Sequence, residues 1–207
     1  MPSAEKNGTE PRTIAQLAKA LQAREITSEA ITKQCLDRID EKNPSLNAFI
    51  RVLADVAREQ ARQADREIAA GRYRGPLHGV PISLKDILDL RGTPSTAASR
   101  VRAGHMAEAD APAVANLREA GAVFVGKCNL HEFAFGTTTD ETAFGAVRNP
   151  FDTSRSAGGS SAGAAVALVE GMCYGSIGTD TGGSIRIPSA ACGSVGLKPT
   201  TLGLSFQ

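Results

Sequence analysis

The chain is poor in aromatic residues and has no excess charge of either sign. Only 4% of its 207 residues are aromatic, none is tryptophan, and the formal net charge is +1. Nucleic-acid-binding surfaces typically combine basic patches with aromatic side chains on which bases stack. A nearly neutral chain also has no strong attraction to polyanions or to membrane surfaces. The composition therefore argues against direct nucleic-acid binding and against membrane association.

Cysteines are few and long hydrophobic runs are absent. The four cysteines form no Cys-x-x-Cys pair, which argues against a zinc knuckle or a redox pair. We therefore expect free thiols in a reducing compartment, with no metal and no other cofactor. No stretch reaches the ~18 apolar residues of a membrane span. Residues 1–12 are polar, without the apolar segment of a signal peptide, and are predicted to be a disordered leader of a cytoplasmic protein.

The hydrophobic fraction of 42% is sufficient for one substantial core, and the first part of the chain has helical patterns. A capping box at 13–16 opens a first helix. A second begins near Ser28 and ends before the Asn-Pro pair at 43–44. A third runs from about 55 to 70 and is closed by a glycine. Residues 13–71 are thus predicted to form a helical layer.

From residue 76 onward the pattern changes, because short apolar segments alternate with helical ones. Each expected helix is followed by a glycine, a common residue just beyond a helix C-terminus. Such alternation implies an α/β protein with a layered mixed sheet flanked by helices. The expected strands lie at 80–84, 122–126 and 174–179, and the expected helices at 110–120 and 161–170.

Two glycine-rich turns each present a serine, and a lysine ends an apolar segment upstream of them. Residues 158–163 read Gly-Gly-Ser-Ser-Ala-Gly, and residues 178–184 read Gly-Thr-Asp-Thr-Gly-Gly-Ser. A hydroxyl on such a turn is a candidate nucleophile, and the backbone N–H groups beside it can stabilise a developing negative charge. Within the segment 79–86, Lys85 ends an apolar, strand-like run. An amine buried there can lose its proton near neutral pH and act as a base.

In this order, the three segments resemble the amidase signature family of serine hydrolases, and the similarity extends from about residue 13 to about residue 200. The resemblance implies the amidase-signature fold, with residues 13–207 as the N-terminal part of a single domain. Within it, residues 76–207 would form the catalytic α/β core. Three further segments are similar to the family, at 126–133, 144–150 and 192–200.

The resemblance implies hydrolysis of an amide bond through an acyl-enzyme intermediate. In this scheme Ser184 attacks the substrate, Ser160 relays protons beside a cis peptide bond, and Lys85 is the base. Lys85 must then be uncharged in the resting enzyme, so its pKa must lie well below the ordinary value of ~10.4. The predicted ligand is a small-molecule amide.

Further residues are assigned around this triad. Asp180 and Arg186 flank the second turn, and we expect them to pair and to stiffen it. The resemblance places an oxyanion hole at the backbone N–H groups of Thr181, Gly182 and Gly183. It places an acyl pocket at Phe133, Ala134 and Gly136.

The family contains stand-alone amidases and also the A subunit of the glutamyl-/aspartyl-tRNA amidotransferase, which releases ammonia from glutamine for a partner enzyme. His131 and Ile187 favour a stand-alone amidase, because the transferase subunit is expected to carry an acidic residue and a glutamine there. Partner subunits are predicted only if the transferase interpretation holds. A third interpretation is an inactive, truncated module that serves in binding or assembly.

Family members are considerably longer than this chain, and their second half completes the sheet and shapes the substrate pocket. We therefore expect a fold that is incomplete at its C-terminus. An incomplete sheet exposes an unpaired edge, which favours formation of a homodimer. The residues that select the amide would mostly lie beyond Gln207.

Overall fold

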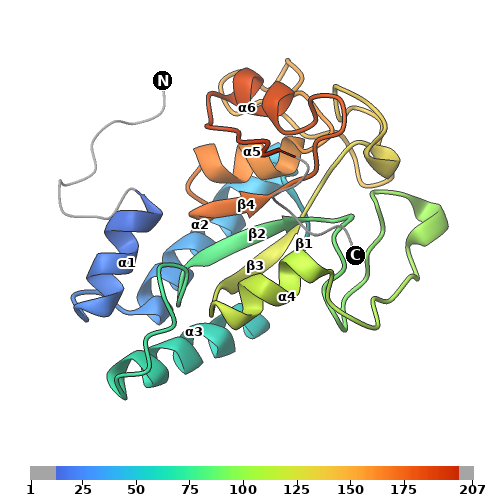
Figure 1. Ribbon diagram of the computed structural model, residues 1–207. Coiled ribbons are helices and arrows are strands. Elements are labelled where there is room, and N and C mark those ends of the chain that lie inside the picture. Colours follow the sequence, from blue (N-terminus) through green and yellow to red (C-terminus); the bar gives the residue numbers. More distant parts are fainter. Residues whose placement is uncertain (1–12, 201–207) are drawn as a thin grey trace.

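A four-stranded mixed sheet forms the centre of the computed structural model, which describes residues 13–200 (Figure 1). The strand order is β1-β3-β2-β4, with β1 antiparallel to β3, and with β2 parallel to both β3 and β4. The predicted layered α/β fold is therefore confirmed, while the predicted leader at 1–12 lies outside the described residues. The strands are β1 (Phe49–Val52), β2 (Pro81–Lys85), β3 (Val123–Cys128) and β4 (Gly175–Ile177).

Helices cover both faces of the sheet (Figure 1). One helix, α5, packs on β2, β3 and β4, and α6 lies above it; α3 packs on β3 and on α2. Within residues 13–200, no helix has the length and apolar character that crossing a bilayer requires. The helices are α1 (Ile14–Gln22), α2 (Ser28–Leu46), α3 (Ala54–Ala69), α4 (Pro112–Glu119), α5 (Ala162–Val169) and α6 (Arg186–Cys192).

Alternation along the strands divides the core into two clusters, one on each face. Ile82 and Phe124, which are paired across β2 and β3, belong to the cluster that includes α1 and α4. The register between these strands then shifts by one residue. After the shift, Lys85 lies opposite Cys128, whose side chain belongs to the cluster that includes α5. Paired residues share a face of a sheet, so the Lys85 side chain points toward α5.

The ends of several helices follow the sequence signals. Thr13 caps α1 in a capping box with Gln16, as predicted. The residue after the cap of α3 is Gly71, with a φ of 75°, a left-handed conformation that glycine adopts without steric cost. Glycines at equivalent positions close α4 and α5, at Gly121 and Gly171. The ends of α3, α4 and α5 are therefore set by local sequence, namely by the glycine that follows each helix.

The predicted end of the second helix is wrong, because α2 continues through Pro44 to Leu46. Its end is fixed by tertiary hydrogen bonds instead. Asn47 adopts a left-handed conformation and donates its side-chain amide to the carbonyl of Gly145, over 2.7 Å. The Asn43 side chain accepts from the N–H of Phe49 over 2.8 Å, which links the last turn of α2 to β1. These bonds compensate for the one that proline cannot donate.

Two elements were not predicted. Strand β1 lies within residues 13–71, so this segment contributes an antiparallel edge strand as well as three helices. Helix α6 has only seven residues and contains Pro188, which weakens its sequence signal. At the other edge of the sheet, β4 has no second partner strand among the described residues.

Gly163 offers a test of how closely α5 approaches the sheet. An added Cβ would lie 2.6 Å from the carbonyl oxygen of Asn129 and would also overlap the carbonyl of Ala48. We predict that Gly163→Ala lowers the free energy of unfolding by about 1–3 kcal/mol, although alanine is the better helix former. Gly104→Ala is the control, because nothing lies within 4 Å of its added Cβ. Equal urea midpoints for the two variants would contradict this packing.

Candidate active site

The carboxyl ends of three parallel strands meet at one edge of the sheet, where ligands commonly bind in open α/β folds. Lys85 is the last residue of β2. The turn at 178–184 follows β4, and the turn at 158–161 leads into α5. Segments that are far apart in the sequence therefore converge at this edge.

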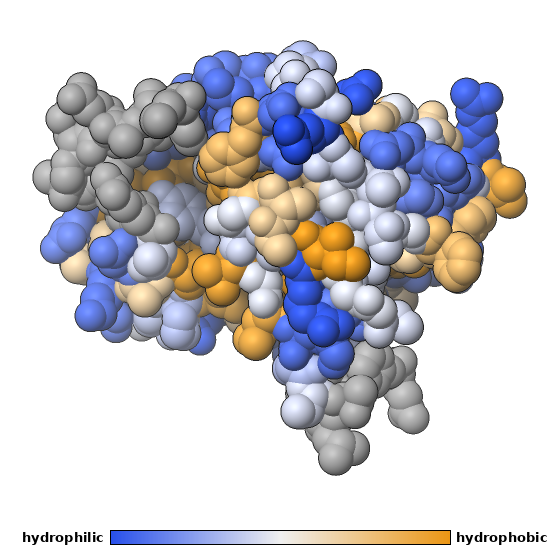
Figure 2. All heavy atoms as spheres, turned by 90° about the horizontal axis from the view of Figure 1, so that it is seen from above, coloured by the Kyte–Doolittle hydropathy of each residue, from blue (hydrophilic) through white to orange (hydrophobic). Residues whose placement is uncertain are grey.

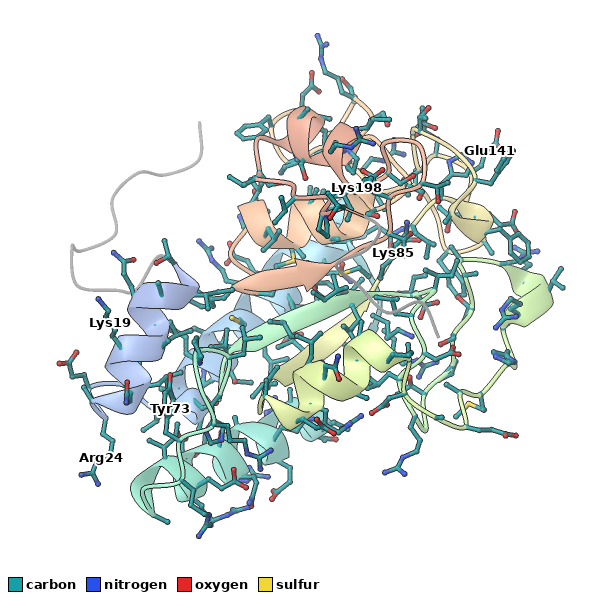
Figure 3. The ribbon with its side chains drawn as sticks, viewed as in Figure 1. Lys19, Arg24, Tyr73, Lys85, Glu141 and Lys198 are labelled. Carbon is teal, nitrogen blue, oxygen red and sulfur yellow. The ribbon has the colours of Figure 1, made fainter. Side chains whose placement is uncertain are left out.

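Lys85 is fully buried and contacts both glycine-rich turns. Its Nζ lies 2.7 Å from Ser160 Oγ and 2.8 Å from Thr179 Oγ1. Figure 3 shows Lys85 in the interior near the end of β2, whereas Glu141 lies at the margin of the molecule. Burial lowers the Lys85 pKa from 10.5 to about 7, against the opposing attraction of the Asp180 carboxylate. An uncharged amine is therefore well populated near neutral pH.

Ser160 is also fully buried, and the peptide bond that precedes it is cis. Its carbonyl accepts the N–H of His131 over 3.2 Å, which connects the turn to the segment after β3. Gly159 must be glycine, because an added Cβ would lie 2.8 Å from Thr139 Oγ1 and 2.9 Å from the backbone of Thr137. Close packing on this segment therefore fixes the turn that presents Ser160.

Ser161 joins the turn of Ser160 to the turn of Ser184. Its N–H donates to the Ser184 carbonyl over 3.0 Å. Its hydroxyl donates to the Thr179 carbonyl over 3.2 Å and accepts the Thr179 N–H over 3.4 Å. Ser184 is half-buried, and within residues 13–200 its hydroxyl forms no hydrogen bond. The candidate nucleophile thus lies next to the Ser160 turn with its hydroxyl available.

Asp180 organises the second turn from within. Its carboxylate accepts the N–H of Gly183 over 2.8 Å and that of Ile185 over 3.1 Å. The Arg186 guanidinium donates to both carboxylate oxygens over 3.0 Å, so the expected pair is present. These bonds, with Arg186 first, hold the pKa of Asp180 far below its usual range, although burial opposes the shift.

The backbone N–H groups of this turn differ in their availability. The Gly183 N–H is directed at Asp180 and is not free for a ligand. Among the described residues, the N–H groups of Thr181, Gly182 and Ser184 have no hydrogen-bond partner. Thr181 and Gly182 are exposed. Three of these four neighbouring amides can therefore donate to an oxyanion.

The segment assigned to the acyl pocket lies beside the Ser160 turn. Phe133 and Ala134 both adopt left-handed conformations, and the Phe133 N–H donates to the Ala97 carbonyl over 2.9 Å. Gly136 packs against the His131 ring, which an added Cβ would overlap. The Phe133 side chain is 49% exposed, so within the part of the chain that the structure describes the segment forms an open wall.

A groove of about 500 Å³ lies between α5, β4 and residues 193–197. It is lined by Ser161 and Ile185, which neighbour the candidate catalytic serines, but not by Ser160, Ser184 or Lys85. Val195 and Leu197 are largely exposed along it. Figure 2, which views the molecule from the side of α6, shows apolar side chains among polar ones.

Two features of this region were not predicted. The first is the pair of contacts from Thr179 and Ser161, because a threonine and a serine in glycine-rich turns give no distinct signal. The second is a buried ion pair between Lys127 and Asp86 at 3.2 Å. Asp86 also accepts the Thr96 N–H over 3.0 Å, which holds the loop whose Ala97 carbonyl contacts Phe133.

The fold and the site define a mixed α/β protein with a buried lysine and two serines from glycine-rich turns at the carboxyl edge of its sheet. Comparison with known proteins identifies its family. The amidase family model matches residues 30–207, and the chain belongs to the amidase signature family. The expected family membership and fold are thereby confirmed.

Individual relatives cover both branches of the family. The A subunit of the Acidothermus cellulolyticus glutamyl-tRNA(Gln) amidotransferase is 47% identical over 94% of this chain and 38% of that protein. The peptide amidase of Stenotrophomonas maltophilia is 40% identical, with a TM-score of 0.84 over 96% of this chain and 41% of that one. The A subunit of the Thermotoga maritima amidotransferase is 34% identical, with a TM-score of 0.77 over 95% of this chain and 40% of that one. The chain thus spans about two fifths of these relatives.

The lowered pKa of Lys85 predicts a pH-dependent stability. Below about pH 7 the folded chain carries a buried ammonium at Lys85, and the cost of burying this charge fully destabilises the folded state. Between about pH 7 and 10.5 only the unfolded chain remains protonated, so the folded state gains stability as the pH rises. Relative to Lys85→Met, the unchanged chain should gain about 1.4 kcal/mol in free energy of unfolding per pH unit. If the two chains differed in free energy of unfolding by the same amount from pH 7 to 9, the lowered pKa of Lys85 would be refuted.

Asp180 predicts a second effect on stability. Asp180→Asn removes the charge that pairs with Arg186 and one of the carboxylate oxygens that accept backbone N–H groups. We expect a loss of about 2–3 kcal/mol at pH 7, measured by urea unfolding. Asp152→Asn is the matched control, because Asp152 accepts from Ser154 and Arg155 in an exposed turn and should matter little. Because the Asp180 pKa is depressed, the contribution of this carboxylate should persist at neutral pH and disappear as the pH falls below 3.8.

Proposed function

We propose that this chain carries the catalytic groups of a hydrolase that cleaves carbon–nitrogen bonds of carboxamides through an acyl-enzyme. One observation carries the proposal: the buried Lys85 amine, with a pKa of about 7, lies 2.7 Å from the Ser160 hydroxyl. A base with a pKa near the working pH is the most effective in proton transfer. Membership of the amidase signature family and relatives among both amidases and amidotransferases support the same reaction.

The contact between Lys85 and Ser160 supports a two-stage reaction, in which the Ser184 hydroxyl would approach Ser160 when a substrate binds. Neutral Lys85 accepts the Ser160 hydroxyl proton while Ser160 accepts that of Ser184, and the Ser184 oxygen attacks the amide carbon. The negatively charged oxygen of the tetrahedral intermediate would accept hydrogen bonds from the free N–H groups of the 181–184 turn. As the carbon–nitrogen bond breaks, the proton returns through Ser160 to the leaving amine. Water, deprotonated through the same relay, then hydrolyses the ester and restores Ser184.

Two substrates are consistent with this chemistry. His131 and Ile187 favour a stand-alone amidase acting on a small carboxamide. The identity of 47% with an amidotransferase component favours glutamine, with ammonia passed to partner subunits. The two candidates are distinguished by assaying ammonia release from glutamine and from other carboxamides, with and without added partner subunits. Activity on glutamine that appears only with partners would select the transferase.

The proposed nucleophile can be tested without knowing the substrate. A fluorophosphonate, which phosphorylates activated serines, should label the unchanged chain, and Ser184→Ala should abolish the labelling. Ser160→Ala should slow labelling by about 10²-fold or more, because it interrupts the proton relay. Ser154→Ala, in an exposed turn, is the control and should label like the unchanged chain. Labelling that survives Ser184→Ala would refute the assignment, and a folded chain that never labels would favour the inactive module.

Among residues 13–200, β4 has no second partner strand, which supports the predicted homodimer because unpaired strand edges pair readily. This proposal concerns assembly and is independent of the catalytic one.

A further inference from the structure

Lys85 has a second hydroxyl partner that the proton relay does not use. Besides Ser160, its Nζ donates to Thr179 Oγ1 over 2.8 Å, and this contact is partly buried. These two hydroxyls are the hydrogen-bond partners of the Lys85 amine among the described residues. They come from different turns, one before α5 and one after β4.

The hydrogens and the lone pair of an uncharged amine explain what the contact with Thr179 can do. Neutral Nζ has two hydrogens and one lone pair, and it rotates about the bond to its side chain. As a base, it must direct the lone pair at the Ser160 hydroxyl rather than donate to it. An acceptor that holds one of the hydrogens elsewhere fixes this rotation. Thr179 Oγ1 lies in position to do so.

Thr179 is itself held in place from two directions. The pairing of Leu84 with Ile177 in β2 and β4 brings Lys85 level with the residues that follow β4. Beyond β4, the Ser161 hydroxyl accepts the Thr179 N–H and donates to the Thr179 carbonyl. The backbone of Thr179 is therefore fixed by the turn that also carries Ser160.

We propose that Thr179 is a positioning residue for the Lys85 base: its hydroxyl accepts one N–H of the amine and directs the lone pair at Ser160. The proposal rests on the proposed relay and adds a member to it. Once Lys85 has taken the proton, the ammonium donates to both hydroxyls, and Thr179 stabilises this charged form. The charged group that acts on Lys85 is Asp180, which is itself paired with Arg186.

The decisive variants are Thr179→Val, which removes the hydroxyl and keeps the shape, and Thr179→Ser, which keeps the hydroxyl. Titration of the Lys85 side chain by ¹³C NMR, assigned with Lys85→Met, measures its acid dissociation constant directly. We expect this constant to rise about tenfold in Thr179→Val, because the ammonium loses a charge-assisted hydrogen bond. Thr179→Ser should stay close to the unchanged chain. Thr153→Val, at an exposed threonine, is the control.

The second readout is the pH profile of fluorophosphonate labelling at Ser184. In Thr179→Val the midpoint should move to lower pH by about one unit, and the plateau should fall about tenfold. Loss of packing alone would lower the plateau without moving the midpoint. Thr179→Ala gives the same test if the valine variant does not fold.

Unchanged Lys85 titration and an unchanged midpoint in a folded Thr179→Val chain would overturn the inference, even if Ser184→Ala still abolishes labelling. Labelling that does not depend on Ser184 would instead refute the proposed function. The NMR titration would then still decide whether Thr179 controls the charge of Lys85, so the two failures are distinguishable.

Discussion

Burial of one amine at the end of a central strand is the constraint around which this site is built. Water would keep Lys85 protonated, whereas the interior lowers its pKa to about 7. A buried amine needs hydrogen-bond partners, and two hydroxyls from separate turns meet that need. Burial of the amine therefore lowers its pKa and also draws the two turns together, so the protonation state of Lys85 and the local packing depend on one constraint.

The two turns that contact this amine are themselves held in place by other residues. Ser161 ties the two turns to each other, Asp180 gathers the backbone of the second turn, and the packing of Gly159 on residues 137–139 fixes the first. None of these residues needs to touch a substrate. Their effect is to hold the hydroxyls and N–H groups of the two turns at fixed positions, and fixed donors of this kind are a main source of electrostatic stabilisation in enzymes. A second buried lysine, Lys127, pairs with Asp86, and Asp86 in turn holds the neighbouring loop through the N–H of Thr96.

The surface beside β4 is open and partly apolar, whereas Lys85 and Ser160 are fully buried. The edge of β4, which is unpaired within residues 13–200, and the groove beside α5 adjoin the candidate site, and exposed Val195 and Leu197 border the groove. The chain spans about two fifths of the relatives it matches. Lys85, Ser160 and Ser184 all lie within the described residues, where the segment around Phe133 forms an open wall.

Local chemistry determined much of the architecture: the capping box at Thr13, the glycines after α3, α4 and α5, and the strand that ends in Lys85 could all be read from the sequence. The glycine-rich turns pointed to the candidate serines only together with the family resemblance, because glycine and serine are common in ordinary turns. Tertiary contacts decided the rest. They carried α2 through Pro44, recruited β1 to the sheet edge, and made Thr179 a partner of Lys85. Such contacts join residues distant in sequence, and neither periodicity nor composition within a segment records which distant atoms will be neighbours.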